Sequence, residues 1–196
     1  MVMAMEPATA EPADLTRYTV ERYFTLVEEG VLEPEDRVEL LEGVVVSMSP
    51  RNPRHDTVIA LVAEALAVAV SQRAAIRVQS SVIIGRYSAP EPDVAVVSGK
   101  TRDYMTAHPS TALLIVEVAD STLPQDRLTK SRLYAAAGVP EYWIVNLRDG
   151  CVEVWREPDV AARSYASLTT ARTGERIELV ALPGASVAVA DLLPDR

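Results

Sequence analysis

Cysteine is almost absent from this chain, which contains only Cys151. A lone cysteine excludes an intramolecular disulfide and a cysteine-based zinc cluster. Long apolar runs are missing too: the most apolar helical segment, residues 58–70, carries Glu64 and falls well short of the roughly 20 residues that a bilayer span needs. Residues 1–15 have neither the basic start nor the apolar centre of a signal peptide. We therefore expect a cytoplasmic protein that does not enter a membrane.

Lysine is also scarce, since only Lys100 and Lys130 are lysines among 19 basic residues. With 28 acidic residues, the formal net charge is −9. Such a charge argues against a protein that coats nucleic acid nonspecifically, but it leaves room for an enzyme with one local basic patch. Because arginine is the default cation here, a lysine is the more informative residue: its ammonium is compact and its pKa can be tuned.

The remaining composition is that of an ordinary globular protein, with 48% hydrophobic and 24% charged residues in a chain of 196. Residues 1–15 are rich in proline, alanine and glutamate, so we expect them to be disordered. We expect residues 16–196 to form a single domain.

Local patterns predict a succession of helix, hairpin, helix, strands, helix and strands. Thr19 is a suitable N-cap for a first helix that ends near Gly30, and Glu42-Gly43 is a suitable turn for a hairpin over residues 37–49. The remaining expected elements are helices over 54–73 and 124–137, strands at 77–84, 93–97 and 113–119, a hairpin over 142–156, and short strands after residue 157. This order predicts an α/β domain with helices packed on a mixed β-sheet.

Two of the apolar, strand-like runs each contain one carboxylate, Asp93 and Glu117. Burying a carboxylate is costly unless a metal, a proton or a partner charge compensates it. On the helix that follows, Asp126, Lys130 and Tyr134 are spaced i, i+4 and i+8, so they share one face that can point at the two carboxylates. Two carboxylates on neighbouring strands with a nearby lysine form a candidate divalent-metal site for phosphodiester hydrolysis.

Several short strings resemble the Uma-two family of restriction-endonuclease-like proteins, over roughly residues 18–156. They are VELLEG at 38–43, SP at 49–50 with His55, PDVAVV at 92–97, EVADST at 117–122 with Asp126, Lys130 and Tyr134, and GVPEYWIV at 138–145. No single string is long, but their order and spacing together are specific.

This resemblance implies the fold of the PD-(D/E)XK nuclease superfamily, a restriction-endonuclease-like mixed β-sheet flanked by helices. It implies that Asp93 and Glu117 bind Mg²⁺, or Mn²⁺, with help from the backbone carbonyl after the glutamate. The superfamily lysine expected two residues after the glutamate is missing, because Ala119 stands there. Lys130 matches a lysine that the Uma-two pattern places on the following helix, where it would assist the attacking water. Glu39 matches an early acidic position and is a candidate additional metal ligand.

Each assignment has a purely structural alternative. Asp93 could simply begin a strand, and Glu117 could form a salt bridge with Arg127 or Lys130. Lys130 could be a solvated helix residue paired with Asp126, and Glu39 an outward residue of a hairpin. The other residues with open roles are His55 (ligand, phosphate contact or helix-start residue), His108 (a loop residue), Tyr134 and Trp143 (core), and Arg51, Arg54, Arg127 and Arg132 (phosphate contacts or solvated side chains).

Three functions remain open at this point. The leading hypothesis is a magnesium-dependent DNA endonuclease, and we expect a homodimer because cutting both strands is simplest with two sites related by a two-fold axis. The second is a non-catalytic assembly protein with a nuclease fold, which the charge of −9 and Ala119 favour. The third is a metal-dependent hydrolase of another phosphoester.

Overall fold

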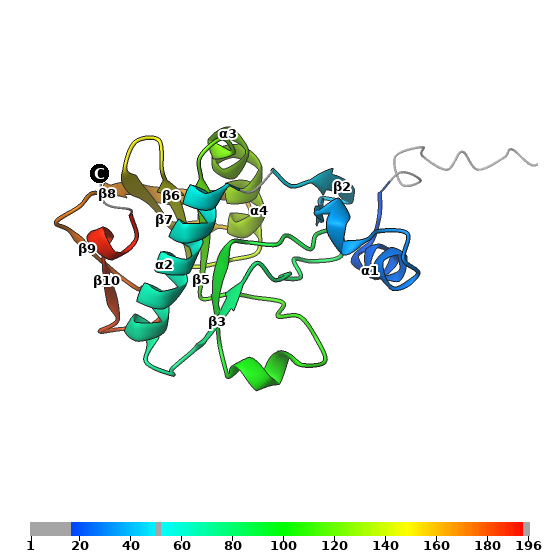
Figure 1. Cartoon of the computed structure of the whole chain (residues 1–196), viewed down its shortest axis with the longest axis horizontal. Coiled ribbons are helices and arrows are strands. Elements are labelled where there is room, and N and C mark those ends of the chain that lie inside the picture. Colours follow the sequence, from blue (N-terminus) through cyan, green and yellow to red (C-terminus); the bar gives the residue numbers. More distant parts are fainter. Residues whose placement is uncertain (1–16, 50–51, 194–196) are drawn as a thin grey trace, which may run out of the picture.

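The computed structural model describes residues 17–49 and 52–193, so the expected disorder of residues 1–15 lies outside the described residues. A six-stranded mixed sheet forms its centre (Figure 1). The helices are α1 (Val20–Glu28), α2 (Pro53–Val70), α3 (Leu123–Gln125) and α4 (Ser131–Ala136), with a π-helical turn η3 (Asp126–Lys130) and 3₁₀ turns η1 (Pro34–Asp36), η2 (Thr101–Tyr104) and η4 (Val189–Asp191). The strands are β1 (Val38–Leu41), β2 (Val44–Ser47), β3 (Ala75–Val78), β4 (Val94–Val97), β5 (Leu114–Ala119), β6 (Glu141–Asn146), β7 (Cys151–Asp159), β8 (Ser164–Ala171), β9 (Arg176–Glu178) and β10 (Ser186–Ala188).

The strands of the central sheet follow the order β3-β4-β5-β6-β7-β8. Only β5 and β6 are parallel, and the chain between them runs through α3, η3 and α4. The other neighbours are antiparallel. Strands β4, β5 and β6 are buried on both faces, which explains why their sequences are nearly continuous apolar runs. This architecture confirms the predicted α/β fold with a mixed sheet flanked by helices.

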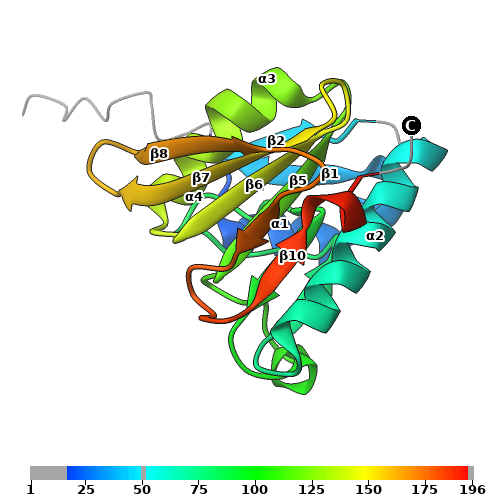
Figure 2. The ribbon, with the colours of Figure 1, turned by 90° about the vertical axis from the view of Figure 1, so that its left-hand side faces the viewer.

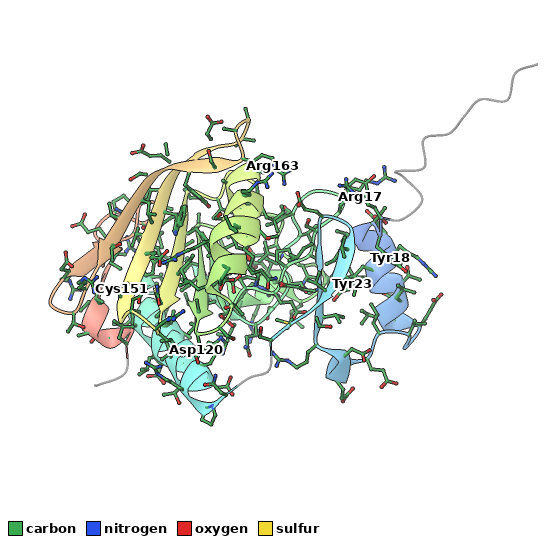
Figure 3. All side chains as sticks on the ribbon, turned by 90° about the horizontal axis from the view of Figure 1, so that it is seen from above. Arg17, Tyr18, Tyr23, Asp120, Cys151 and Arg163 are labelled. Carbon is green, nitrogen blue, oxygen red and sulfur yellow. The ribbon has the colours of Figure 1, made fainter. Side chains whose placement is uncertain are left out.

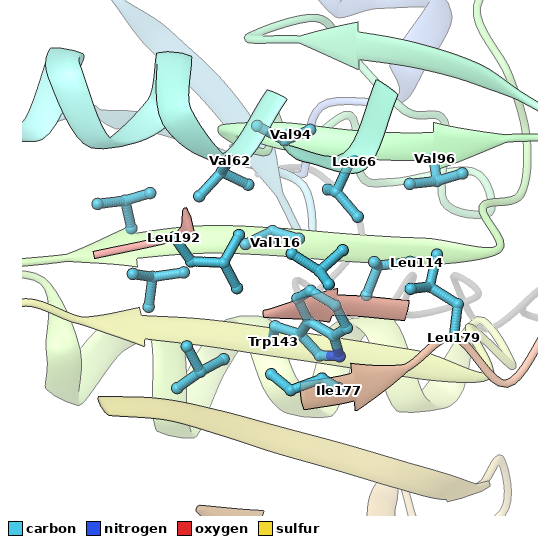
Figure 4. Close-up of a cluster of buried hydrophobic side chains, with 14 of the residues drawn as sticks. Val62, Leu66, Val94, Val96, Leu114, Val116, Trp143, Ile177, Leu179 and Leu192 are labelled. Carbon is cyan, nitrogen blue, oxygen red and sulfur yellow. The ribbon is translucent and has the colours of Figure 1, made fainter. Parts of the chain in front are cut away.

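One face of the sheet packs against α2 and against the small β9–β10 sheet (Figure 2). Val62 and Leu66 of α2 meet Val94, Val116 and Trp143 of the sheet in this cluster (Figure 4). Alternate residues of each strand point to opposite faces, so Val94 and Val96 belong to this side while Ala95 and Val97 belong to the other. The opposite face packs against α3 and α4 through Leu123, Leu133 and Tyr134.

A third, smaller cluster joins α1 to the β1–β2 hairpin at one end of the molecule (Figure 1). Thr19 caps α1 as predicted, because its hydroxyl accepts a hydrogen bond from the backbone amide of Arg22 at 3.2 Å. Tyr23, labelled in Figure 3, donates from its hydroxyl to the backbone carbonyl of Val38 at 2.9 Å. This contact fastens α1 to the first strand of the hairpin, which carries Glu39.

Three elements differ from the sequence-based expectation. The long helix ends at Val70 rather than Arg73, because Ser71 and Gln72 adopt left-handed conformations. Only one face of this helix is buried, although most of its faces are apolar, and Val68 on the outer face is 81% exposed. The strand expected over 77–84 stops at Val78, since Gln79 is left-handed and β4 supplies only four partners. Finally, β8 is one strand of eight residues rather than a short piece. Within the described residues, no helix is both long and apolar enough to span a bilayer.

Candidate active site

The register of β4 and β5 decides where the two predicted carboxylates lie. Val94 is paired with Val116 in the antiparallel register. Asp93 therefore lies opposite Glu117, one residue beyond this last pair. Side chains alternate between faces, and Asp93 and Glu117 therefore share the face of Ala95 and Ile115, on which α3 and α4 pack. Both side chains are buried and line one cavity. The expected adjacency on neighbouring strands is thus present.

Lys130 enters the same cavity from the helical segment after β5. Its Nζ lies 2.9 Å from Glu117 Oε1 and 3.4 Å from Glu39 Oε1, and all three side chains are buried. Glu39 comes from β1, and its second carboxylate oxygen accepts a hydrogen bond from the backbone amide of Glu91 at 3.0 Å. Lys130 is therefore a buried cation between two carboxylates, and not a solvated lysine paired with Asp126.

The segment that carries Lys130 is a π-helical turn, which the sequence did not predict. In it, the backbone amide of Ser131 bonds to the carbonyl of Asp126, five residues back. Such turns are rare and occur frequently at functional sites. Lys130 and Tyr134 both reach Glu117 on β5, and Asp126 lines the same cavity, in agreement with their spacing.

Tyr134 and Asp126 complete the polar network around Glu117. The Tyr134 hydroxyl donates to Glu117 Oε1 at 2.8 Å, so this tyrosine, interpreted from the sequence as core, also orients a site carboxylate. Asp126 accepts a hydrogen bond from the Thr122 hydroxyl at 2.7 Å. Burial raises the pKa of Asp126 to about 6 despite the nearby Lys130, and burial likewise raises the pKa of Glu117 well above its usual range.

His55 reaches the cavity from the first turn of α2. Asn52 caps this helix by accepting from the backbone amide of His55 at 3.0 Å, and Pro53 fills the first helical position. The Nε2 atom of His55 lies 3.5 Å from Asp93 Oδ2, and that oxygen also accepts from the backbone amide of Val118 at 2.8 Å. The Asp93 carboxylate raises the pKa of His55, while burial acts in the opposite direction.

The cavity between these groups has a volume of about 50 Å³, enough for a small number of water-sized ligands. It is lined by five carboxylates but only two permanent cations, Arg37 and Lys130. The carboxylates are Glu39, Glu91, Asp93, Glu117 and Asp126. This excess of buried negative charge and the oxygen donors fit a divalent cation such as Mg²⁺ or Mn²⁺.

The donor side chains do not yet converge on one point. In the described parts of the chain, no three His, Cys, Asp or Glu side chains lie close enough together to hold an ion as they stand. The Lys130 ammonium forms an ion pair with the Glu117 carboxylate, and the His55 imidazole faces the Asp93 carboxylate. Binding of an ion therefore requires these contacts to open.

The remaining residues singled out from the sequence lie elsewhere. Arg127 pairs with Glu153, Arg54 donates to the backbone carbonyl of Leu147, and Arg132 is exposed. His108 stacks on Phe24 at a centroid distance of 5.1 Å, and Trp143 is part of the core. Arg51 falls outside the described residues. Arg37, Thr122 and Gln125 also line the cavity, although none of them was singled out individually from the sequence.

Two further carboxylates show that burial in an apolar strand does not by itself mark a site. Glu141 on β6 is fully buried, but its oxygens accept from Arg156, from Trp143 Nε1 and from the backbone amide of Val180. Glu153 on β7 is paired with Arg127 and Asn146. Both are satisfied structural groups, whereas Asp93 and Glu117 border a cavity.

The chain matches the family Uma2, described as "Putative restriction endonuclease", over residues 20–190. The protein belongs to the Uma2 family. This confirms the resemblance inferred from the short strings at 38–43, 92–97 and 117–145. The family description supports a nuclease.

The fold has a counterpart among solved structures. A crystal structure described as a putative nuclease belonging to DUF820, from Anabaena variabilis ATCC 29413, superimposes with a TM-score of 0.68 at 14% sequence identity. The match covers 89% of this chain and 96% of that one. At this identity the likeness establishes the fold of this Uma2 protein, a mixed sheet flanked by helices. None of the curated proteins matches the chain.

Proposed function

We propose that this Uma2 protein is a magnesium-dependent DNA endonuclease of the PD-(D/E)XK type. The observation that carries the proposal is the pairing of Asp93 with Glu117 across neighbouring strands, on one wall of a cavity that Lys130 also enters. The family description, which names a restriction endonuclease, supports DNA as the substrate. A phosphodiester is an anion, so an acidic cavity can accept it only with added positive charge.

Asp93 and Glu117 would hold the ion, and Glu39 is placed to assist from β1. When bound, Mg²⁺ or Mn²⁺ would supply charge neutralisation at the scissile phosphate and a more acidic water. Val118 keeps the Asp93 carboxylate in place through its backbone amide, and Tyr134 does the same for Glu117. These contacts fix the two carboxylates before substrate arrives, which lowers the cost of organising the site.

Lys130 acts as a permanent cation in this scheme. Burial alone would lower its pKa, but the carboxylates of Glu117, Glu39 and Asp126 raise it above its usual range. In this protonated form Lys130 is a hydrogen-bond donor and not a general base. Its role is to donate hydrogen bonds to a phosphate oxygen or to the attacking hydroxide once its contact with Glu117 opens.

The test is cleavage of supercoiled plasmid DNA and of short duplexes in Mg²⁺ or Mn²⁺. The variants Asp93→Asn and Glu117→Gln are expected to abolish cleavage. Asp120→Asn is the matched control, because Asp120 directly follows β5 (Figure 3) but is exposed and contacts Asn52 instead of the cavity. Wild-type protein that binds metal yet cleaves no DNA would favour a different phosphoester. Protein that binds no metal would favour the non-catalytic assembly protein.

A further inference from the structure

His55 brings a nitrogen atom into a cavity that is otherwise lined by oxygen donors. Its Nε2 faces Asp93 Oδ2 at 3.5 Å, and the backbone carbonyl of Val118 interacts with the same ring. The helix cap at Asn52 holds the backbone of His55 at this point. The imidazole is thus fixed beside the carboxylate that is the first candidate metal ligand.

The surroundings of the other ring nitrogen, Nδ1, indicate the role of this imidazole. Nδ1 is buried and has no hydrogen-bond partner among the described residues, while Asp56 Oδ1 lies 3.7 Å away. A histidine that binds a metal through one nitrogen usually donates the N–H of the other to a carboxylate, which fixes its tautomer. The His55 ring has this layout, with Nε2 toward the cavity and Nδ1 toward a carboxylate. His108 offers no such arrangement, since it stacks on Phe24 away from any site carboxylate.

We propose that His55 is a metal ligand through Nε2, together with Asp93 and Glu117, and that Asp56 accepts the Nδ1 proton. This inference rests on the proposed function, because it takes the Asp93–Glu117 cavity as the metal site. It has a consequence for the choice of metal. Mg²⁺ takes oxygen ligands, whereas imidazole suits transition-metal ions. A set of two carboxylates and one imidazole should therefore bind Mn²⁺ more tightly than Mg²⁺, while still accepting Mg²⁺.

Metal binding by the full chain, without DNA, provides the test. Mn²⁺ and Mg²⁺ are titrated separately into chelator-treated protein by calorimetry, and the Mn²⁺ complex is studied by electron spin echo envelope modulation, which detects a directly bound nitrogen. We expect wild-type protein to bind Mn²⁺ at least about tenfold more tightly than Mg²⁺ and to show nitrogen coupling. The wild-type spectrum requires no variant, so it stays informative even if a variant fails to fold.

Variants then assign the nitrogen to one residue. His55→Ala is expected to remove the coupling and to erase most of the preference for Mn²⁺. His108→Ala, which removes the other histidine of the chain, should change neither. Asp56→Asn should keep the coupling but weaken Mn²⁺ binding by about tenfold, the low end of the range for a residue that orients a metal ligand, since Asp56 is half exposed.

The outcomes separate this inference from the proposed function. Equal affinities for the two ions without nitrogen coupling, or coupling that survives in His55→Ala, would overturn the role of His55 and leave the nuclease proposal standing. Nitrogen coupling that is lost in His55→Ala, in a protein that cleaves no DNA, would support the ligand and count against the nuclease. Wild-type protein that binds neither ion would overturn both.

Discussion

Lys130 and Glu117 form a buried ion pair, with Nζ and Oε1 2.9 Å apart and relative exposures of only 6% and 3%. Taking two charges out of water costs several kcal/mol per ion, so a buried pair is weak evidence for a stabilising role. In this protein the pair borders the cavity that also contains Asp93. Its position fits the role that we propose for that cavity better than a purely stabilising role.

The first prediction concerns removal of this lysine. Lys130→Met should destabilise the protein by about 3–5 kcal/mol at neutral pH, because the buried Glu117 and Glu39 carboxylates lose their cation. The double variant Lys130→Met/Glu117→Gln should recover a large part of this loss, and both variants should lack metal-dependent cleavage. Urea denaturation measures the stabilities. Lys100→Met is the control, since Lys100 is exposed and its loss should cost no more than about 0.5 kcal/mol. A single variant as stable as wild type would contradict the buried pair.

A second prediction compares Tyr134, which is fully buried, with Tyr165, which is partly buried and packs against the same cluster. Tyr134 donates to the Glu117 carboxylate at 2.8 Å, while Tyr165 donates to the neutral backbone carbonyl of Val139 at 2.9 Å. Hydrogen bonds to charged acceptors contribute about 1.5–3 kcal/mol and neutral ones about 0.5–1.5 kcal/mol. Tyr134→Phe should thus destabilise the protein more than Tyr165→Phe, as measured by urea denaturation. Equal losses would show that Glu117 does not depend on the tyrosine hydroxyl.

Much of the fold follows from local sequence signals. The Thr19 cap, the turn at Glu42-Gly43 and the apolar runs around Asp93 and Glu117 each specify an element by themselves, and the structure has these elements where the signals predict them. The alternation of side chains along β4 and β5 then places Asp93 and Glu117 on one face of the sheet. The ends of strands were harder to predict. Strand β3 ends at Val78 because Gln79 has a left-handed backbone conformation and because β4 supplies only four paired residues.

The composition of the site was harder to predict, since its contacts join distant parts of the chain. Glu117, Glu141 and Glu153 all stand in apolar strands, and only the tertiary partners distinguish the first from the other two. The i, i+4 spacing of the residues on this helix face does not distinguish a π-helical turn from an α-helix, so the turn could not be predicted. Likewise, the contact of His55 with Asp93 depends on how α2 packs on the sheet.

The third prediction concerns pH. Burial raises the pKa of Asp126 from 3.8 to about 6, so the folded state holds this proton more tightly than the unfolded chain. The resulting stability is present below about pH 3.8 and is lost as the pH rises through about 6. Asp126→Asn removes this dependence. Relative to wild type, its free energy of unfolding should increase between pH 4 and pH 7 by up to about 3 kcal/mol. Urea denaturation in chelator measures this difference, and a difference that stays constant with pH would contradict the raised pKa.

A fourth prediction is a homodimer at micromolar concentration. A small nuclease cuts both strands most simply with two sites related by a two-fold axis, and two-fold dimers are the commonest symmetric assembly. Light scattering coupled to gel filtration should give twice the mass of the chain, in chelator as well as in Mg²⁺. A monomer under both conditions would require the two strands to be cut in separate binding events, and plasmid DNA would then accumulate as the nicked form.

The last prediction concerns how an acidic protein binds an anion. The net charge is −9 and five carboxylates line the cavity, so the metal-free site should repel phosphate. A divalent ion offsets that charge, and Ca²⁺ can do so without supporting cleavage. The affinity for a short DNA duplex should therefore rise when Ca²⁺ is added and fall steeply between about 50 and 200 mM salt, because phosphate contacts release counterions.

Asp93→Asn should weaken the effect of Ca²⁺, while Asp120→Asn should leave it unchanged because Asp120 lies outside the cavity. Fluorescence anisotropy titrations with and without Ca²⁺ at two salt concentrations measure these effects. Affinity that does not respond to Ca²⁺ would place the DNA contacts away from the Asp93–Glu117 cavity, and no binding under any of the four conditions would favour the assembly protein.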